Sequence, residues 1–415
     1  MRNKLTRRTV MAGAALAQAA RPALVRQDWP VFDELEEKAV LDVLRSGKWS
    51  RSSGGQRAIE FEARYAALTG AKYCLATANG TSALIAALNA CDVGPGDAVL
   101  LPPYTFVATL NVILLQHALP IFVDSNLETF QIDAGKLDAA VTPECRVVLP
   151  VHLGGAPADL DTILAFAKKR GLKVIEDACQ SHLGEWRGKK VGTLGDCGCF
   201  SFQASKNLNS GEGGALITND DALMDRAYAF HGNGRGRKAE VAGFSYASNG
   251  ANLRLTDFQG ALLLAQMTRL EEQSRRREQN AKYLASMLAK IPGIKPARLY
   301  DGCTRNAWHL FMFRLESGAG VSRSQFLKNL SARGVGGSGG YSPLNKEPFL
   351  RRIVEGRHYK RVYGEKRIRE WVERNHCPVN DRLCQEAVWF SQTTLLGSRS
   401  DMEQIAEAVS KARAA

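Results

Sequence analysis

A lysine near the middle of the chain has the surroundings of a reactive amine. Lys206 follows the apolar run 197–202, and the glycine-rich segment 211–214 leads into a second apolar run at 215–217. Burial between strands withdraws an amine from water, and this lowers its pKa. Because a neutral amine attacks a carbonyl carbon, Lys206 is a candidate for covalent chemistry on an aldehyde or a ketone.

An acidic pair closes another apolar run. Glu176 and Asp177 come directly after residues 173–175. A carboxylate at the end of a buried strand is unfavourable unless a positive group pairs with it. A protonated ring nitrogen is one such group, because a carboxylate keeps it charged. Taken alone, this stretch is explained equally well by Asp177 capping a helix.

Hydroxyl residues follow a third apolar run. Gly80, Thr81 and Ser82 come after residues 73–77, at the predicted start of a helix. Free backbone N–H groups and the helix dipole make such a turn an anion site, although helix capping alone is the simpler interpretation. Ser201, five residues before Lys206, could reach the same anion.

The three segments are expected to meet at one edge of a sheet. In an open parallel sheet, ligands bind outside the carboxyl ends of the strands. An anion cradle, an acid and a lysine correspond to the phosphate, the ring nitrogen and the aldehyde of pyridoxal phosphate. The sequence therefore predicts this cofactor, with Lys206 as its covalent partner and Asp177 beside its ring nitrogen.

The elements that must hold these residues alternate along the chain. Short apolar runs and amphipathic stretches at this rhythm predict a mostly parallel sheet covered on both faces by helices. Residues 28–275 would form this large domain. Strands are predicted at 73–77, 98–101, 120–123, 147–151, 173–176 and 197–202, and helices at 33–46, 82–90, 106–116 and 160–169.

A second, smaller domain is predicted for the rest of the chain. Helical periodicity runs almost unbroken over 255–288, so a long helix would lead out of the sheet domain. Beyond it, the pattern predicts a strand at 310–315 and helices at 324–333 and 402–412. Residues 276–415 would therefore form a smaller α/β domain.

Composition excludes several other classes of protein. The formal net charge of +13 is spread thinly, and its densest stretch, 351–374, alternates Arg and Lys with Glu as on a solvated helical face. No nucleic-acid-binding motif accompanies this charge, so nucleic acid is not an expected partner. The nine cysteines include no CxxC pair, and His152, His182 and His309 lack a ligand pattern. Neither a metal site nor a disulfide framework is expected.

The N-terminal residues 1–27 are treated apart from the fold. Arg7 and Arg8 precede a modest apolar stretch and a run of small residues, an order that resembles a twin-arginine export signal. A basic tail with an Ala-rich helical turn is the alternative. The first interpretation predicts export to the periplasm and the second a cytoplasmic protein. The apolar stretch is too short for a stable membrane span.

The chain resembles the sugar aminotransferase family named after DegT, DnrJ, EryC and StrS. The resemblance covers nearly all of residues 29–396, and the matching segments occur in the family's order and spacing. These segments are 79–84, 103–108, 150–153, 176–180, 195–202 and 252–256.

The resemblance implies an α/β architecture of fold type I, that of the aspartate-aminotransferase-like enzymes dependent on pyridoxal phosphate. It also implies a homodimer with active sites at the interface. Position by position, Lys206 would be the Schiff-base lysine and Asp177 the partner of the ring nitrogen, with Phe106 and Gln180 on opposite faces of the ring. The phosphate would be bound by Gly80, Thr81, Ser82 and Ser201, and by Asn252 of the neighbouring subunit.

The resemblance also narrows the reaction. Some relatives carry His in place of the lysine and dehydrate sugars, so Lys206 favours amino transfer. Segments 29–32, 47–51, 340–344 and 387–390 resemble the branch acting on scyllo-inosose and related cyclitols, which includes relatives of aminohydroxybenzoate synthase. We therefore expect L-glutamine or L-glutamate to donate an amino group to a keto-cyclitol or a keto-sugar, nucleotide-linked or free. A dehydratase or aromatising synthase using the same Lys206 stays open, as does a non-catalytic sensor of the cofactor or a sugar.

Overall fold

The computed structural model describes residues 28–237 and 246–414. The predicted export signal at 1–27 lies outside the described residues. Among the helices of the described part, none combines the length and the apolar character that crossing a membrane would need.

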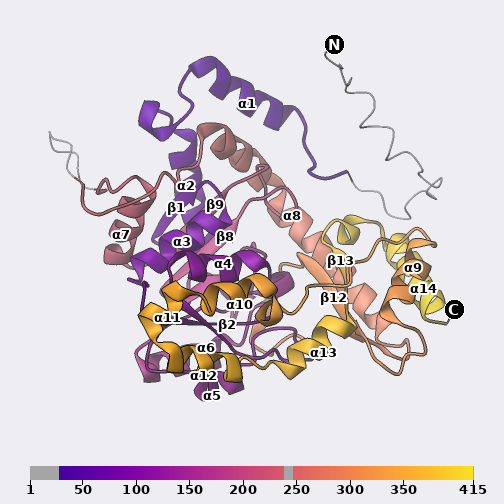
Figure 1. The fold of residues 1–415 in the computed structure, drawn as a ribbon. Coiled ribbons are helices and arrows are strands. Elements are labelled where there is room, and N and C mark those ends of the chain that lie inside the picture. The colour runs from indigo at the N-terminus through magenta and orange to yellow at the C-terminus, as the bar shows by residue number, and fades with distance from the viewer. Residues whose placement is uncertain (1–27, 238–245, 415) are drawn as a thin grey trace, which may run out of the picture.

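A seven-stranded sheet forms the centre of the molecule (Figure 1). Its strands run in the order β1-β9-β8-β5-β4-β2-β3, and β9 alone is antiparallel to its two neighbours. The mostly parallel sheet predicted from the alternation of apolar runs is thus confirmed. The strands are β1 (Tyr73–Thr77), β2 (Ala98–Leu101), β3 (Leu119–Phe122), β4 (Cys145–Val148), β5 (Lys173–Asp177), β8 (Cys197–Ser201) and β9 (Gly214–Thr218).

The helices that pack with this sheet begin and end at residues suited to those positions. The Asn79 side chain accepts a hydrogen bond from Ser82 N at the start of α3, and Gly171 ends α6 with a φ of 67°. Strand residues such as Val99, Val147 and Ile175 are completely buried against these helices. The helices of this half are α1 (Glu34–Ser46), α2 (Arg57–Thr69), α3 (Gly80–Ala90), α4 (Val107–Leu115), α5 (Leu137–Ala140), α6 (Leu160–Arg170) and α7 (Asp221–His231).

One long helix links the central sheet to the rest of the chain. Helix α8 (Asp257–Leu288) starts at a capping box formed by Thr256 and Gln259. Its first part contacts α1 and α2, and it also contacts α14 (Arg399–Ala414). In Figure 1 it runs from the indigo helices toward the yellow C-terminal end.

Beyond α8 lies a second, antiparallel sheet. Strands β10 (Ile294–Pro296), β12 (Leu310–Leu315) and β13 (Ala387–Ser391) form it in the order β10-β12-β13. Side chains of this sheet, of α8, of α9 (Arg323–Ser331) and of α14 share one buried cluster. A third small sheet has the order β11-β6-β7, with β6 (Glu185–Trp186) and β7 (Lys189–Lys190) from the first half and β11 (Cys303–Arg305) from the second.

Part of the second half returns to the central sheet. Leu350, Tyr359, Ile368 and Trp371 belong to the same buried cluster as the strands of that sheet. They lie on α10 (Pro348–Val354), α11 (Arg357–Tyr363) and α12 (Glu365–Arg374), after which α13 (Pro378–Glu386) leads back to β13. The packing of α10 to α12 against the central sheet was not predicted from the sequence. A division of the chain into two domains near residue 275 stays a prediction.

Candidate active site

The three segments singled out by the sequence come together at one place. A Cβ atom at Gly80 would lie 2.8 Å from Ser201 Cβ and 2.9 Å from Cys179 Sγ. The first residue of α3 therefore packs directly against Ser201 at the end of β8 and Cys179 just after β5, at a distance that excludes any side chain. Residues after β1, β5 and β8 thus form one site, although β9 lies between β1 and β8 in the sheet.

Glu176 and Asp177 are neighbours with different surroundings. The Glu176 carboxylate is completely buried and lies 2.9 Å from His152 Nε2, and it accepts hydrogen bonds from Gly192 N, Leu194 N and Gly195 N. His152 Nδ1 accepts a hydrogen bond from Ala158 N, so its Nε2 is the donor to Glu176. The bonding capacity of this carboxylate is taken up by the fold.

Asp177 keeps an open acceptor position. Its Oδ2 accepts a hydrogen bond from Thr109 Oγ1 at 2.8 Å, and its Oδ1 accepts one from Cys179 N at 3.2 Å. The side chain is almost fully buried, and it forms no ion pair with any residue in the described chain. A buried carboxylate whose donors are all neutral is suited to a cationic N–H group brought by a ligand. Thr109, on α4, was not foreseen because nothing in its local sequence marks it.

The Lys206 amine lies near this carboxylate. Burial lowers the pKa of Lys206, while the nearby Cys179 and Asp177 partly oppose that shift. Across residues 28–237 and 246–414, no hydrogen bond or ion pair holds its Nζ. A half-buried amine without a fixed partner, kept closer to its neutral form, is able to attack a carbonyl carbon.

The hydroxyl groups of the cradle are available for an anion. Asn79 caps α3, so the simpler interpretation of Thr81 and Ser82 as helix caps is wrong. Ser82 and Ser201 are buried, and the Ser201 Oγ accepts only a long bond of 3.4 Å from Gln203 N. Buried hydroxyls beside the first turn of a helix provide the donors that a phosphate group requires.

The remaining predicted residues differ in how firmly the chain holds them. Gln180 is fixed from both sides, since its Oε1 accepts from Gly154 N at 2.7 Å and its Nε2 donates to Tyr341 Oη at 3.2 Å. Phe106 at the start of α4 is 57% exposed. Asn252 is also exposed, although its backbone forms a bridge with Gly232 near the end of β1. The single chain thus leaves Phe106 and Asn252 open to contact from outside.

His182 was interpreted as a core or pocket histidine, and the structure assigns it a supporting position. Its Nε2 lies 2.9 Å from the Ser201 carbonyl oxygen and must donate to it, so Nδ1 accepts from Tyr65 Oη at 3.0 Å. Burial lowers the pKa of His182 to about 3, the hydrogen bond to Ser201 opposes this, and the Lys206 charge adds to it. The neutral ring therefore holds the backbone of Ser201 in place.

The parts of pyridoxal phosphate match this donor set. The Lys206 amine suits its aldehyde, the Asp177 carboxylate its ring nitrogen, and the hydroxyls beside Gly80 its phosphate. Each of these groups is buried or half-buried and is incompletely bonded within the described chain. No cluster of three or more His, Cys, Asp or Glu side chains in that part of the chain could hold a metal ion.

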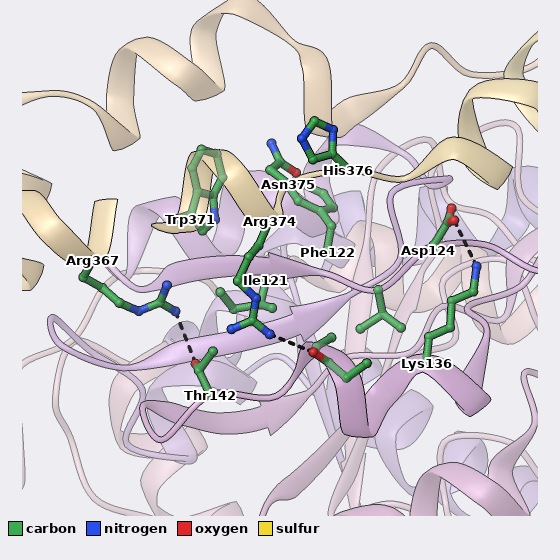
Figure 2. A pocket seen from close by; sticks show the side chains of 13 residues that line it. Ile121, Phe122, Asp124, Lys136, Thr142, Arg367, Trp371, Arg374, Asn375 and His376 are labelled. Atoms are coloured by element: carbon green, nitrogen blue, oxygen red, sulfur yellow. Dashed lines mark hydrogen bonds and ion pairs between the residues drawn. The ribbon is translucent and has the colours of Figure 1, made fainter. Parts of the chain in front are cut away.

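A separate cavity lies between β3 and α12 (Figure 2). It has a volume of about 180 Å³, and none of the predicted site residues lines it. Its cationic side chains are engaged by the chain itself: Lys136 pairs with Asp124 at 3.0 Å, and Arg374 Nη2 donates to the Ala139 carbonyl. The cavity is therefore distinct from the candidate site around Lys206.

Comparison with known proteins agrees with the geometry. Residues 30–410 match the model of the DegT/DnrJ/EryC1/StrS aminotransferase family. L-glutamine:2-deoxy-scyllo-inosose aminotransferase from Streptoalloteichus tenebrarius is 37% identical over 404 residues, which cover 92% of this chain and 94% of the relative. GDP-perosamine synthase from Caulobacter vibrioides is 36% identical over 321 residues, which cover 77% of this chain and 85% of the relative.

A solved structure shows the same fold over almost the whole chain. The crystal structure of 3-amino-5-hydroxybenzoic acid synthase superposes with a TM-score of 0.85 at 29% identity. The match covers 94% of this chain and 99% of that chain. 3-Amino-5-hydroxybenzoate synthase from Amycolatopsis mediterranei is 30% identical over 393 residues.

Proposed function

This chain belongs to the DegT/DnrJ/EryC1/StrS aminotransferase family, and from that premise we propose that it moves an amino group from L-glutamine or L-glutamate to a keto-cyclitol or a keto-sugar. It is a pyridoxal-phosphate-dependent aminotransferase with the α/β architecture of fold type I. A relative whose name specifies L-glutamine and an inosose supports this choice of donor and acceptor.

The arrangement of Lys206 and Asp177 carries the proposal. Lys206 would hold the cofactor covalently, and Asp177 would face the ring nitrogen, because its carboxylate is buried and forms no ion pair with any described residue. Thr81, Ser82 and Ser201, beside Gly80, would bind the phosphate. When bound, pyridoxal phosphate supplies an electron sink for the charge left on a carbon that loses a proton.

The chain's own residues would perform the proton chemistry and the orientation. Burial favours the neutral form of the Lys206 amine. This amine would take a proton from the donor carbon and deliver it to a carbon of the cofactor. Asp177 would keep the ring nitrogen protonated. Gln180, fixed by Gly154 and Tyr341, would support one face of the ring, and Phe106 the other.

We also propose a homodimer with shared sites. Helix α1 and the segment after it expose Leu35, Leu41, Leu44 and Trp49, which is unusual for a surface that faces only water. Asn252 is exposed, and in this proposal it would reach the phosphate bound by the partner chain. Sedimentation of the purified protein at micromolar concentration would test the assembly, and a monomer would contradict it.

An absorption experiment tests the reaction directly. The protein is mixed with pyridoxal phosphate, the visible band is recorded, and L-glutamine or L-glutamate is added without any acceptor. We expect the band to disappear as the donor is consumed. Lys206→Ala should give no such band and no turnover, whereas Lys189→Ala, an exposed lysine on β7, should behave as the unchanged protein. Normal turnover by Lys206→Ala would contradict the proposal.

A second activity at the same lysine is favoured by the similarity to 3-amino-5-hydroxybenzoate synthase. A dehydratase or an aromatising synthase would form the same visible band, but its product would have lost water from the ring. Mass analysis of the product of a keto-cyclitol separates the two reactions. A sensor without turnover would bind the cofactor and leave both donors unchanged.

A further inference from the structure

The loop that carries Lys206 is held by side chains from distant parts of the chain. Trp29 Nε1 donates a hydrogen bond to the Ala204 carbonyl at 2.7 Å, and Gln392 Nε2 donates a long one of 3.5 Å to the Ser205 carbonyl. The carbonyls of the two residues immediately before Lys206 are thus both held from outside the loop. On its other side, Asn207 Nδ2 donates to the Ala307 carbonyl at 2.7 Å.

Arg277 on α8 joins the two side chains that hold those carbonyls. It is completely buried and forms no ion pair within the described chain. Its Nε and Nη2 donate to Gln392 Oε1 at 2.9 and 2.6 Å, and its guanidinium carbon lies 5.3 Å from the centre of the Trp29 ring. Because Arg277 occupies Oε1, the Gln392 amide must turn its Nε2 toward the Ser205 carbonyl.

A buried guanidinium without a carboxylate is an unusual arrangement. Loss of hydration is unfavourable, and among the described residues the Gln392 oxygen and the face of the Trp29 indole offset it. The charge therefore draws both side chains toward one point.

The position of Trp29 is itself fixed by the same helix. Gln266 Nε2 on α8 donates to the Val31 carbonyl at 2.8 Å and to Glu36 Oε1 at 2.7 Å. Arg269, one turn further along, pairs with Asp33 and Glu36. Residues 29–36 are thus bound along α8, and the Trp29 indole is directed at the Lys206 loop.

We propose that Trp29, Arg277 and Gln392 act as positioning residues for Lys206. They fix the Ala204 and Ser205 carbonyls and thereby the direction in which the Lys206 side chain leaves the backbone. None of the three forms a hydrogen bond or an ion pair with Lys206 Nζ or Asp177 in the described chain, so they act through the loop. This inference rests on the proposed role of Lys206 in holding the cofactor.

The first test needs no cofactor. Trp29→Phe keeps an aromatic ring over Arg277 and removes the N–H that binds Ala204. Trp186→Phe is the matched control, because Trp186 is also buried and donates its Nε1 to Asp161 at 2.8 Å, away from the loop. Amide hydrogen exchange over residues 203–208 should become about 2- to 10-fold faster in Trp29→Phe alone, as the loss of one hydrogen bond implies. Equal exchange in both variants would overturn the proposal.

The second test uses the protein with pyridoxal phosphate. Trp29→Phe should slow the donor-driven loss of the visible band and shift the pH midpoint of that band. The donor concentration that gives half of the maximal rate should change little. Gln392→Met, which removes the three hydrogen bonds of the amide, should change the same quantities in the same direction if Trp29→Phe does not fold. An unshifted midpoint and an unchanged rate in whichever variant folds would overturn the proposal.

Borohydride reduction followed by peptide mapping separates this inference from its premise. If reduction attaches the cofactor to a lysine other than Lys206, the proposed function itself is wrong. If Lys206 is labelled and the loop behaves identically in Trp29→Phe and Trp186→Phe, the premise stands and the positioning role alone fails.

Discussion

Two adjacent carboxylates show that burial alone does not assign a function. Glu176 and Asp177 are consecutive on β5, so their side chains point to opposite faces of the sheet. Glu176 is saturated by His152 and three backbone N–H groups, whereas within the described residues Asp177 is bonded by neutral donors and forms no ion pair. The incomplete bonding of Asp177 is what makes it available to a ligand.

Asp177→Asn tests that availability at the level of one atom. The amide keeps the shape of the side chain but not the charge that would hold a ring nitrogen protonated. We expect kcat with L-glutamine to fall by about 10²-fold or more. The cofactor-free variant should unfold at the same or a higher urea concentration, because a buried charge has been removed. Asp133→Asn, at a surface turn, is the control, and equal kcat values would contradict the role of Asp177.

Lys206 should make the stability of the cofactor-free protein depend on pH. Burial lowers its pKa below the ordinary value of 10.5, with Asp177 and Cys179 acting against the shift. Between the two values the unfolded chain binds more protons than the folded chain, so the free energy of unfolding rises with pH.

Urea unfolding of the cofactor-free protein and of Lys206→Met at several pH values measures this effect. Lys206→Met should be the more stable of the two at neutral pH, and the difference should shrink as the pH approaches 10.5. If the free energies of unfolding of the two proteins differ by the same amount at every pH, the pKa of Lys206 is not lowered in the folded protein.

At the scale of elements, periodicity located many of the strands and helices but missed α2 and α7, and it did not predict how the strands pair. The predicted strands at 73–77, 98–101 and 310–315 match β1, β2 and β12 residue for residue. The antiparallel direction of β9 was not predicted, because a buried strand has the same apolar pattern in either direction. Thr109 and Tyr341 were missed for a related reason: each reaches the site from an element whose local sequence does not reveal what it faces.

The edge of the central sheet is closed by aromatic side chains from the returning helices. On β3, Trp371 Nε1 donates to the Pro120 carbonyl at 2.6 Å, and Tyr359 Oη donates to the Ala118 carbonyl just before that strand at 3.0 Å. An uncovered edge strand invites pairing with another chain. The solvated face inferred for 351–374 therefore has an opposite face that buries Ile368 and Trp371 against the sheet. Figure 2 shows Trp371 above β3.

Trp371→Phe tests the contribution of that edge. It keeps most of the packing and leaves the Pro120 carbonyl buried without its donor. We expect a loss of about 1–3 kcal/mol in the free energy of unfolding, with turnover unchanged at temperatures where the variant is folded. Trp308→Phe, at a buried tryptophan whose Nε1 has no hydrogen-bond partner in the described chain, removes a similar volume and should lower the urea midpoint less. Equal midpoints for the two variants would show that the carbonyl finds another partner.

At the scale of the whole molecule, the fold class followed from the sequence and the long-range connections did not. The alternation of apolar runs sufficed for a covered, mostly parallel sheet. The third sheet joins β6 and β7 to β11, and residues 348–377 return to the first core, so the two halves of the chain are interlocked. Such contacts join residues more than a hundred positions apart, and local periodicity carries no information about them.

The proposed dimer predicts that two impaired variants regain activity when they are mixed, which a monomeric enzyme would not do. If Asn252 serves the site of the partner chain, a dimer of one Lys206→Ala chain and one Asn252→Asp chain contains one intact site. That site takes Lys206 from the second chain and Asn252 from the first. Random pairing should then restore roughly a quarter of the activity of the unchanged protein.

Each variant is first assayed alone, and the two are then mixed under conditions that exchange subunits. We expect both to be strongly impaired separately, because Asn252→Asp places a second negative charge beside the phosphate. The matched control mixes Lys206→Ala with Asp177→Asn. Both residues belong to the site of their own chain, so this heterodimer contains no intact site. Recovery in the first mixture and not in the second places Asn252 across the interface. No recovery in either mixture would place it within its own chain or exclude the dimer.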